Sequence, residues 1–114
     1  MKINEMQLYS ALNEYIDREL LPLGASMDFI QQILYGTKIG VIKRRAEVVI
    51  KKYLNKPEMK MLELVDENGL IDIEPIYQSA MDMINKMQKV EIGGITFKPN
   101  DLQNLYSTLQ RHAN

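Results

Sequence analysis

Apolar residues recur at helical spacing along most of this chain, and that periodicity limits the folds it can adopt. The first such segment, residues 3 to 20, carries charged residues on its opposite side, which predicts an amphipathic helix of about five turns. Pro22 and Gly24 should end this helix, because proline cannot continue the hydrogen-bond ladder and glycine accepts the left-handed backbone common after a helix. The predicted apolar face comprises Ile3, Met6, Tyr9, Leu12, Ile16 and Leu20.

A second apolar stripe follows Ser26, whose hydroxyl can cap a helix. Its members are Met27, Phe29, Ile30, Ile33 and Leu34. Whether this helix continues to residue 54 depends on Gly36 and Gly40, since a glycine inside a helix costs ~1 kcal/mol relative to alanine. We expect two helices separated near residues 36 to 40. The alternative is a single helix in which the two glycines permit close contact with a neighbouring helix.

A basic block occupies residues 38 to 60, although the whole chain has a net charge of only −1. The block contains eight Lys and Arg residues and two acidic residues, a net charge of +6, whereas the segments before and after it carry −3 and −4. Such a charge distribution can attract a polyanion or pair copies of the chain with one another. Within the block, residues 41 to 54 predict a helix whose core face comprises Ile42, Ala46, Val49, Ile50 and Tyr53.

The opposite side of this helix is the candidate interaction surface. Val41 and Val48 are seven residues apart and fall among the cations of that side. Apolar side chains between long cationic ones indicate either a second buried contact or a surface whose partner is another molecule. The candidate surface comprises Val41, Arg44, Arg45, Val48, Lys51 and Lys52.

Two shorter helices are predicted after the basic block. Pro57 suits a first helical turn, and the apolar residues after it extend that helix to about residue 65, before Asn68 and Gly69. Asp72 can cap the next helix, whose apolar face extends to residue 87. We interpret the methionines of these two helices as core filler, with an adaptable interface as the alternative. They are Met59, Met61, Met81, Met83 and Met87.

The apolar period changes from helical spacing to strict alternation at residues 89 to 98, around Gly93 and Gly94. This pattern predicts a tight β-hairpin. An isolated two-stranded hairpin is marginally stable in water, so its apolar face must lie on the helices or join strands of another copy. That face comprises Val90, Ile92, Ile95 and Phe97.

A last helix is predicted after Pro99, where Asn100 and Gln103 have the spacing of a capping box. Its inward face comprises Leu102, Leu105, Tyr106 and Leu109. The sequence therefore predicts a mainly α protein, a single-domain helical bundle over residues 1 to 114. We expect about five or six helices, with one C-terminal β-hairpin before the last helix.

Composition argues against several kinds of chemical site. The chain has no Cys, which excludes disulfides, thiolate metal sites and cysteine nucleophiles. The single histidine, His112, is expected in a fraying terminus, and a zinc site needs about three or four protein ligands. The calcium-loop spacing fails at Leu64, so we interpret the acids that follow it as helix caps and solvated residues. Those acids are Asp66, Glu67, Asp72 and Glu74. We expect no enzymatic activity, cofactor or metal.

The sequence also bears on location. No apolar run approaches the ~18 to 20 residues of a membrane span, and the first residues lack the apolar stretch of a secretory signal. We therefore expect a cytoplasmic protein without membrane contact.

Three segments of the second half carry a resemblance to known proteins: DENGLIDI at residues 66 to 73, VEIGGITF at residues 90 to 97 and DLQNLY at residues 101 to 106. They resemble small uncharacterised proteins from phages and prophages of Gram-positive bacteria. The likeness covers about half of the chain and lies in turn, cap and core positions. It implies a small accessory or assembly protein and supplies no catalytic residues.

The leading functional hypothesis is a non-enzymatic interaction or assembly protein that self-associates. It would use the surface around Val41 and Val48, or the unpaired edge of the hairpin. The alternative is a nucleic-acid-binding accessory protein that uses the basic helix 41–54, although no aromatic residue on that face is placed to stack on bases. A small hydrolase is a third hypothesis.

Overall fold

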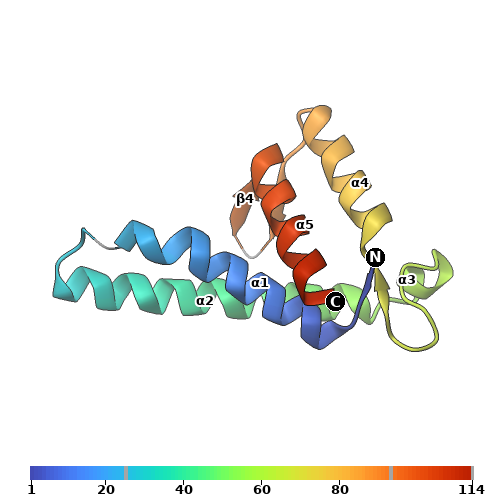
Figure 1. Ribbon diagram of the computed structural model, residues 1–114, viewed down its shortest axis with the longest axis horizontal. Helices are drawn as coiled ribbons and strands as arrows, with labels where there is room; N and C mark the ends of the chain where they lie inside the picture. The colour runs from blue at the N-terminus through green and yellow to red at the C-terminus, as the bar shows by residue number, and fades with distance from the viewer. Residues whose placement is uncertain (25, 93, 114) are drawn as a thin grey trace.

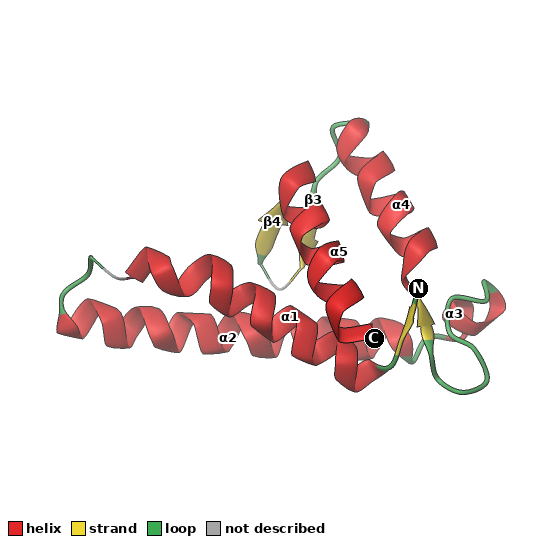
Figure 2. Cartoon of the chain, in the orientation of Figure 1, coloured by secondary structure: helices red, strands yellow, loops and turns green. Residues whose placement is uncertain are grey.

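In the part of the chain that the structure describes, the fold consists of five α-helices and two small antiparallel sheets (Figures 1 and 2). The structure is a computed structural model that describes residues 1–24, 26–92 and 94–113. The helices of these residues are α1 (Glu5–Leu20), α2 (Phe29–Leu54), α3 (Pro57–Met61), α4 (Ile73–Asn85) and α5 (Pro99–Ala113), with a 3₁₀ helix, η1 (Leu21–Gly24). The strands are β1 (Lys2–Ile3), β2 (Ile71–Asp72), β3 (Val90–Ile92) and β4 (Ile95–Phe97). The prediction of a mainly helical protein with a β-hairpin before the last helix is confirmed.

Helices α1 and α2 form a long antiparallel hairpin that gives the molecule its elongated shape, with extents of 49 × 30 × 25 Å (Figure 1). We call the end where α1 turns into α2 the tip; it comprises residues 21–24 and 26–37. At the other end, the base, α4, α5 and the β3–β4 hairpin lie on one side of the helical hairpin, and α3 and the β1–β2 sheet lie at its end (Figure 2). The two ends therefore differ in how many elements can cover each helix.

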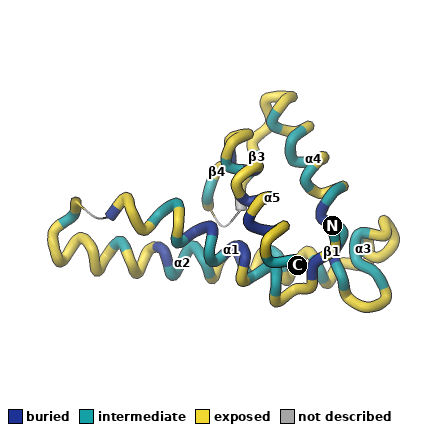
Figure 3. Tube along the Cα trace, in the orientation of Figure 1, coloured by how far each residue is buried: buried dark blue, intermediate teal, exposed yellow. Residues whose placement is uncertain are grey.

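The buried core lies at the base, where α1 packs on α5 and α2. Ile3, Ile16 and Ile71 are almost completely buried, whereas most residues of the tip are exposed (Figure 3). Tyr15 of α1 stacks on Phe97 of β4 with 5.8 Å between ring centroids. Phe97, with Val90 and Ile95 packed against the same core, therefore places the β-hairpin on the helices, one of the two arrangements expected from the sequence.

The start of the chain differs from the prediction, because Ile3 is not helical. It lies in β1, which pairs with β2 so that Ile3 opposes Ile71. Helix α1 begins at Glu5, where Asn4 and Gln7 form a capping box. Ile3 is thereby buried by a strand pairing, whereas Met6, on the predicted apolar face, is 72% exposed.

Helix α2 is continuous, so the predicted break near residues 36 to 40 is wrong. It begins after Asp28, which forms a capping box with Gln31, rather than after Ser26. The alternative of close helix contact also fails within this chain, because a Cβ added at Gly36 or Gly40 would meet nothing within 4 Å. The glycine cost of ~1 kcal/mol each is offset because α2 packs on α1 on both sides of the glycines.

Three other boundaries follow from local hydrogen bonds. Asp72 caps α4 as predicted, with its Oδ1 accepting from the Glu74 backbone N–H at 3.3 Å. The predicted capping box of the last helix is wrong, because Asp101 accepts from the Lys98 backbone N–H at 2.9 Å and α5 begins before Asn100. Helix α3 ends at Met61 instead of continuing to residue 65.

The β-hairpin has the predicted register, with Val90 opposite Phe97 and Ile92 opposite Ile95. Of the two turn residues, Gly94 has a φ of +89°, which glycine adopts without strain, and Gly93 lies outside the described residues.

The methionines fit the core interpretation only in part. Met59 and Met81 are half-buried, whereas Met61 is 80% and Met87 96% exposed. The interpretation as core filler is therefore wrong for Met61 and Met87.

Candidate interaction surface

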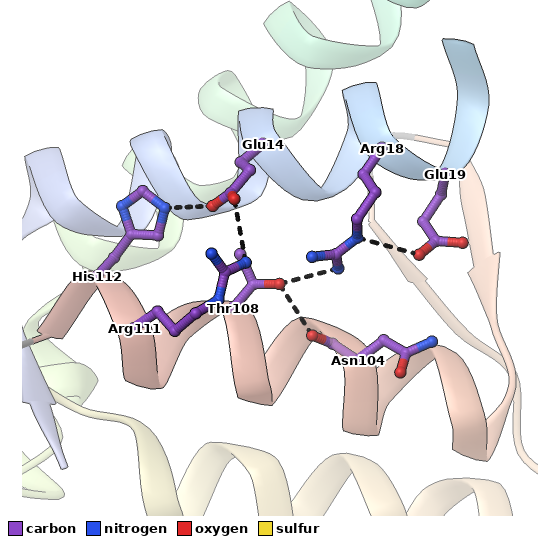
Figure 4. A network of polar contacts seen from close by, with 7 residues as sticks. All are labelled: Glu14, Arg18, Glu19, Asn104, Thr108, Arg111 and His112. Atoms are coloured by element: carbon purple, nitrogen blue, oxygen red, sulfur yellow. Dashed lines mark hydrogen bonds and ion pairs between the residues drawn. The ribbon is translucent and has the colours of Figure 1, made fainter. Parts of the chain in front are cut away.

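A polar network joins α1 to α5 and contains the only histidine (Figure 4). Arg18 Nη2 donates to Thr108 Oγ1 at 2.9 Å, and that buried hydroxyl donates to the Asn104 carbonyl at 3.0 Å. Glu14 accepts from Arg111 Nη2 at 3.0 Å and pairs with His112. The hydrogen bond with His112 is the largest cause that holds the pKa of Glu14 below its ordinary value, and the hydrogen bond and charge of Arg111 lower it further.

This network corrects the expectation for His112. The residue lies within α5 and contacts α1, so it does not belong to a fraying terminus. The Thr108 hydroxyl is already engaged on both sides, as donor to Asn104 and acceptor from Arg18. The arrangement therefore ties the two helices together.

Of the acids near residue 70, Asp66 and Asp72 cap a turn and a helix and Glu67 is exposed, as predicted, whereas Glu74 accepts a hydrogen bond from the Tyr106 hydroxyl. Asp66 accepts from the backbone N–H groups of Asn68 and Leu70 at 2.9 Å each, and Lys2 lies 3.2 Å away. The Leu70 hydrogen bond is the largest reason why the pKa of Asp66 lies below its ordinary value. Across residues 1–24, 26–92 and 94–113, no group of three or more His, Cys, Asp or Glu residues could hold a metal ion.

The candidate surface predicted from the sequence lies on the side of α2 that faces away from α1, and we call it the cationic face. It comprises Val41, Arg44, Arg45, Val48, Lys51 and Lys52. Val48 is 67% exposed, Val41 is half-buried, and the four cations are exposed. A shallow groove of about 610 Å³ separates this face from the β-hairpin, where Glu91 and Gly94 form its other wall.

The charges of the cationic face are largely unpaired. Lys43, on the flank of α2, pairs with Asp17 of α1 at 2.6 Å. Within the described part of the chain, none of Arg44, Arg45, Lys51 and Lys52 has a carboxylate within 4.0 Å. Glu91, across the groove, pairs instead with Lys89 at 3.0 Å. The face thus presents cations that are free to meet an anionic group.

A second exposed surface, which we call the tip patch, was not singled out from the sequence. All its members are large apolar side chains that are more than half exposed, from 52% for Leu21 to 75% for Phe29. They come from η1 and the first turns of α2 and are Leu21, Leu23, Phe29, Ile30, Ile33 and Leu34. The apolar stripe predicted after Ser26 is therefore real but uncovered in this chain.

The α2 residues of the tip patch share one side of the helix with the cationic face. Ile30, Val41 and Val48 are spaced by 11 and 7 residues, which is close to whole turns at about 3.6 residues per turn. The same spacing relates Ile33 to Arg44 and Lys51, and Leu34 to Arg45 and Lys52. We call this whole side the outward face of α2. The sequence prediction missed this shared side because it divided α2 at the two glycines. A helical wheel over residues 29 to 54 places these residues on one side.

A third feature is an apolar groove of about 480 Å³ between α2, α4 and α5. Tyr53 and Val49, predicted on the core face, line this groove and are 53% and 38% exposed. Their prediction as core residues is therefore only partly met, because α4 does not close over this part of α2.

Comparisons with known proteins add no relative, since no family model, curated protein or solved structure matches this chain. Among the helices of the described residues, none is both long and apolar enough to cross a membrane.

Proposed function

We propose that this protein is a non-enzymatic interaction protein of the cytoplasm that self-associates. The observation that carries the proposal is the outward face of α2, which its own chain leaves largely uncovered from Phe29 to Lys52. Four large apolar residues of the tip lie in this exposed region together with Val48; they are Phe29, Ile30, Ile33 and Leu34. Scattered exposed apolar residues are normal in soluble proteins, but a contiguous group of this kind marks an interaction site.

The resemblance of the second half to small phage and prophage proteins is compatible with an accessory or assembly role. The unpaired edges of β3 and β4 are a further route for association, because exposed strand edges can pair with another chain. The strands have three residues each, so this route offers few hydrogen bonds.

Light scattering across a concentration series tests self-association. We expect the mass of one chain at low micromolar concentration and of at least two chains near millimolar concentration. A mass of one chain over the whole range would contradict the proposal.

A nucleic-acid-binding accessory protein is the second candidate, favoured by the four unpaired cations of the cationic face. Cations that replace condensed counterions on a phosphate backbone give an affinity that falls steeply with salt. We expect salt-dependent retention on heparin and duplex DNA that Arg44→Glu with Arg45→Glu abolishes. The matched control is Lys86→Glu with Lys98→Glu, which changes the net charge equally at exposed positions outside the basic helix. Absence of binding at low salt removes this candidate.

A further inference from the structure

The tip patch is large enough to form most of a stable contact. Its six members are 52% to 75% exposed. At about 100 Å² or more for each such side chain, the patch presents roughly 600 Å² of apolar surface, at the upper end of what monomers usually expose. A stable interface buries about 800 Å² on each partner, so the patch with its polar rim reaches that size.

The tip patch is also almost free of charge. Asp28 is the single charged residue between positions 21 and 37, and its side chain is engaged as the cap of α2, accepting from the Gln31 backbone N–H at 2.9 Å. A two-fold contact places each surface against its own copy, so a charged surface meets like charge there. The cationic face would bring Arg44 and Arg45 close to the same residues of the partner, whereas the tip patch brings only apolar groups together.

The tip has a defined conformation that can present these side chains. The Tyr35 hydroxyl donates to the Leu20 carbonyl at 2.7 Å, and the Tyr35 ring lies against Gly24. Gln32 Nε2 donates to the Met27 carbonyl at 2.9 Å, which fastens the connection to α2. These two hydrogen bonds therefore tie α2 to the end of α1 and to the residue before the Asp28 cap.

The shape of the tip suits contact with its own copy. Phe29 is the most exposed residue of the patch at 75%. A hollow of about 250 Å³ lies between η1 and α2 and is lined by Leu21, Gly24, Gln32, Tyr35 and Gly36. A self-complementary surface needs both a protruding group and a recess, because each copy must fill the recess of the other.

We propose that two copies of this chain associate tip to tip across a two-fold axis that passes next to Ile33, with their α2 helices antiparallel. The inference rests on the proposed self-association and adds the surface and its symmetry. Phe29 of each copy fills the hollow of the other, and the two cationic faces point to opposite ends of the assembly, where they remain open.

A charge-swap experiment at Ile33 tests this geometry. Ile33→Lys and Ile33→Glu each place two like charges beside the axis, so each variant alone should be monomeric, with a dissociation constant raised at least about 100-fold. An equimolar mixture should recover the two-chain mass, because the charges are then opposite. Light scattering and sedimentation measure both results. The matched control is Val48→Lys, which should keep the wild-type mass because this 67% exposed valine lies on the same helix outside the tip.

The outcomes separate this inference from the proposed function. A wild-type chain that is always monomeric contradicts both. If both Ile33 variants retain the wild-type mass, or their mixture does not recover it, self-association stands and the tip-to-tip geometry is wrong. Circular dichroism checks that the variants are folded, and Leu34→Lys with Leu34→Glu repeats the test if an Ile33 variant is not. Flotation of a monomeric wild type with vesicles of anionic phospholipid would make the tip a membrane contact and would also overturn the inference.

Discussion

Helix α2 runs through both the tip and the base of the molecule, yet apolar residues are buried to different extents in these two regions. At the base, α1 lies against α2 and α5, and Ile16 is completely buried. At the tip, within the described residues, the first turns of α2 pack on η1, and Ile33 is 53% exposed although it belongs to a regular apolar stripe. A pair of helices can bury one stripe of each, so a second apolar stripe needs another partner. The tip patch is therefore an apolar surface that the fold of a single chain leaves largely exposed.

The largest difference between the two regions should appear on truncation of matched isoleucines. Ile16→Ala removes a fully buried side chain and should lower the free energy of unfolding by about 2 to 5 kcal/mol. Ile33→Ala should change it by about 0.5 kcal/mol or less, because its side chain is exposed. Urea denaturation at low micromolar concentration measures both. Equal losses for the two variants would mean that the tip is covered within one chain.

An intermediate effect is expected at Gly24, where the tip is closely packed. A Cβ at this position would lie 2.8 Å from Tyr35 Cδ1, and the hydroxyl bond to Leu20 restrains that ring. Gly24→Ala should therefore cost about 1 to 3 kcal/mol of unfolding free energy. In a Tyr35→Ala background the same substitution should cost much less, because the clashing ring is gone. An unchanged cost in that background would show that the strain lies elsewhere.

A smaller effect of opposite sign is expected at Gly36. A Cβ there meets no atom within 4 Å, so Gly36→Ala should raise the unfolding free energy by about 0.5 to 1 kcal/mol through helix propensity. Gly40→Ala is the matched substitution one turn further along, with the same open surroundings. Thermal unfolding followed by circular dichroism measures both. A loss of stability would reveal a neighbour at this position.

The smallest effect concerns pH and is confined to the base. The folded pKa of Glu14 lies below its ordinary value of 4.5, so its ionised form favours the folded state. That contribution is present above pH 4.5 and is lost as the pH falls through the lowered folded pKa. Glu14→Gln should therefore make stability less dependent on pH in this acidic range, as measured by urea denaturation at several pH values. Glu67→Gln, at an exposed position, is the control. An unchanged profile for Glu14→Gln would contradict the role of the network with His112.

Elements defined by neighbouring residues were predictable from the sequence. Asp72 was predicted as a helix cap, and the alternation around Gly93 and Gly94 predicted a β-hairpin. Both predictions depend on the backbone preferences of neighbouring residues, and both α4 and the β-hairpin form at the expected places. The pairing of β1 with β2 was not predictable, because two strands of two residues each give no periodic signal. Ile3 is buried by that pairing, and the sequence alone could only place it on a helix.

The candidate surface was predictable in its composition but not in its extent. The spacing of Val41 and Val48 among cations indicated an exposed side of α2, and Val48 is indeed exposed. Gly36 and Gly40 led to the prediction of a break in α2, so the tip patch and the cationic face were assigned to two helices. Packing of α2 on α1 keeps the helix continuous instead. Periodicity identifies an apolar stripe, but it does not show whether another element covers it, and Phe29 at 75% exposure is the example.

The hydrogen bond between Arg18 and Thr108 has a kinetic consequence. It joins residues 90 positions apart, and the pair Glu14 and Arg111 spans 97. Contacts between such distant residues require closure of a long loop, which slows folding relative to a bundle stabilised by local contacts. The helical hairpin of α1 and α2 involves much shorter loops and can form early. We therefore expect the docking of α5 on α1 to be the slow step of refolding. Until α5 docks, the apolar surface of α1 remains accessible to chaperones.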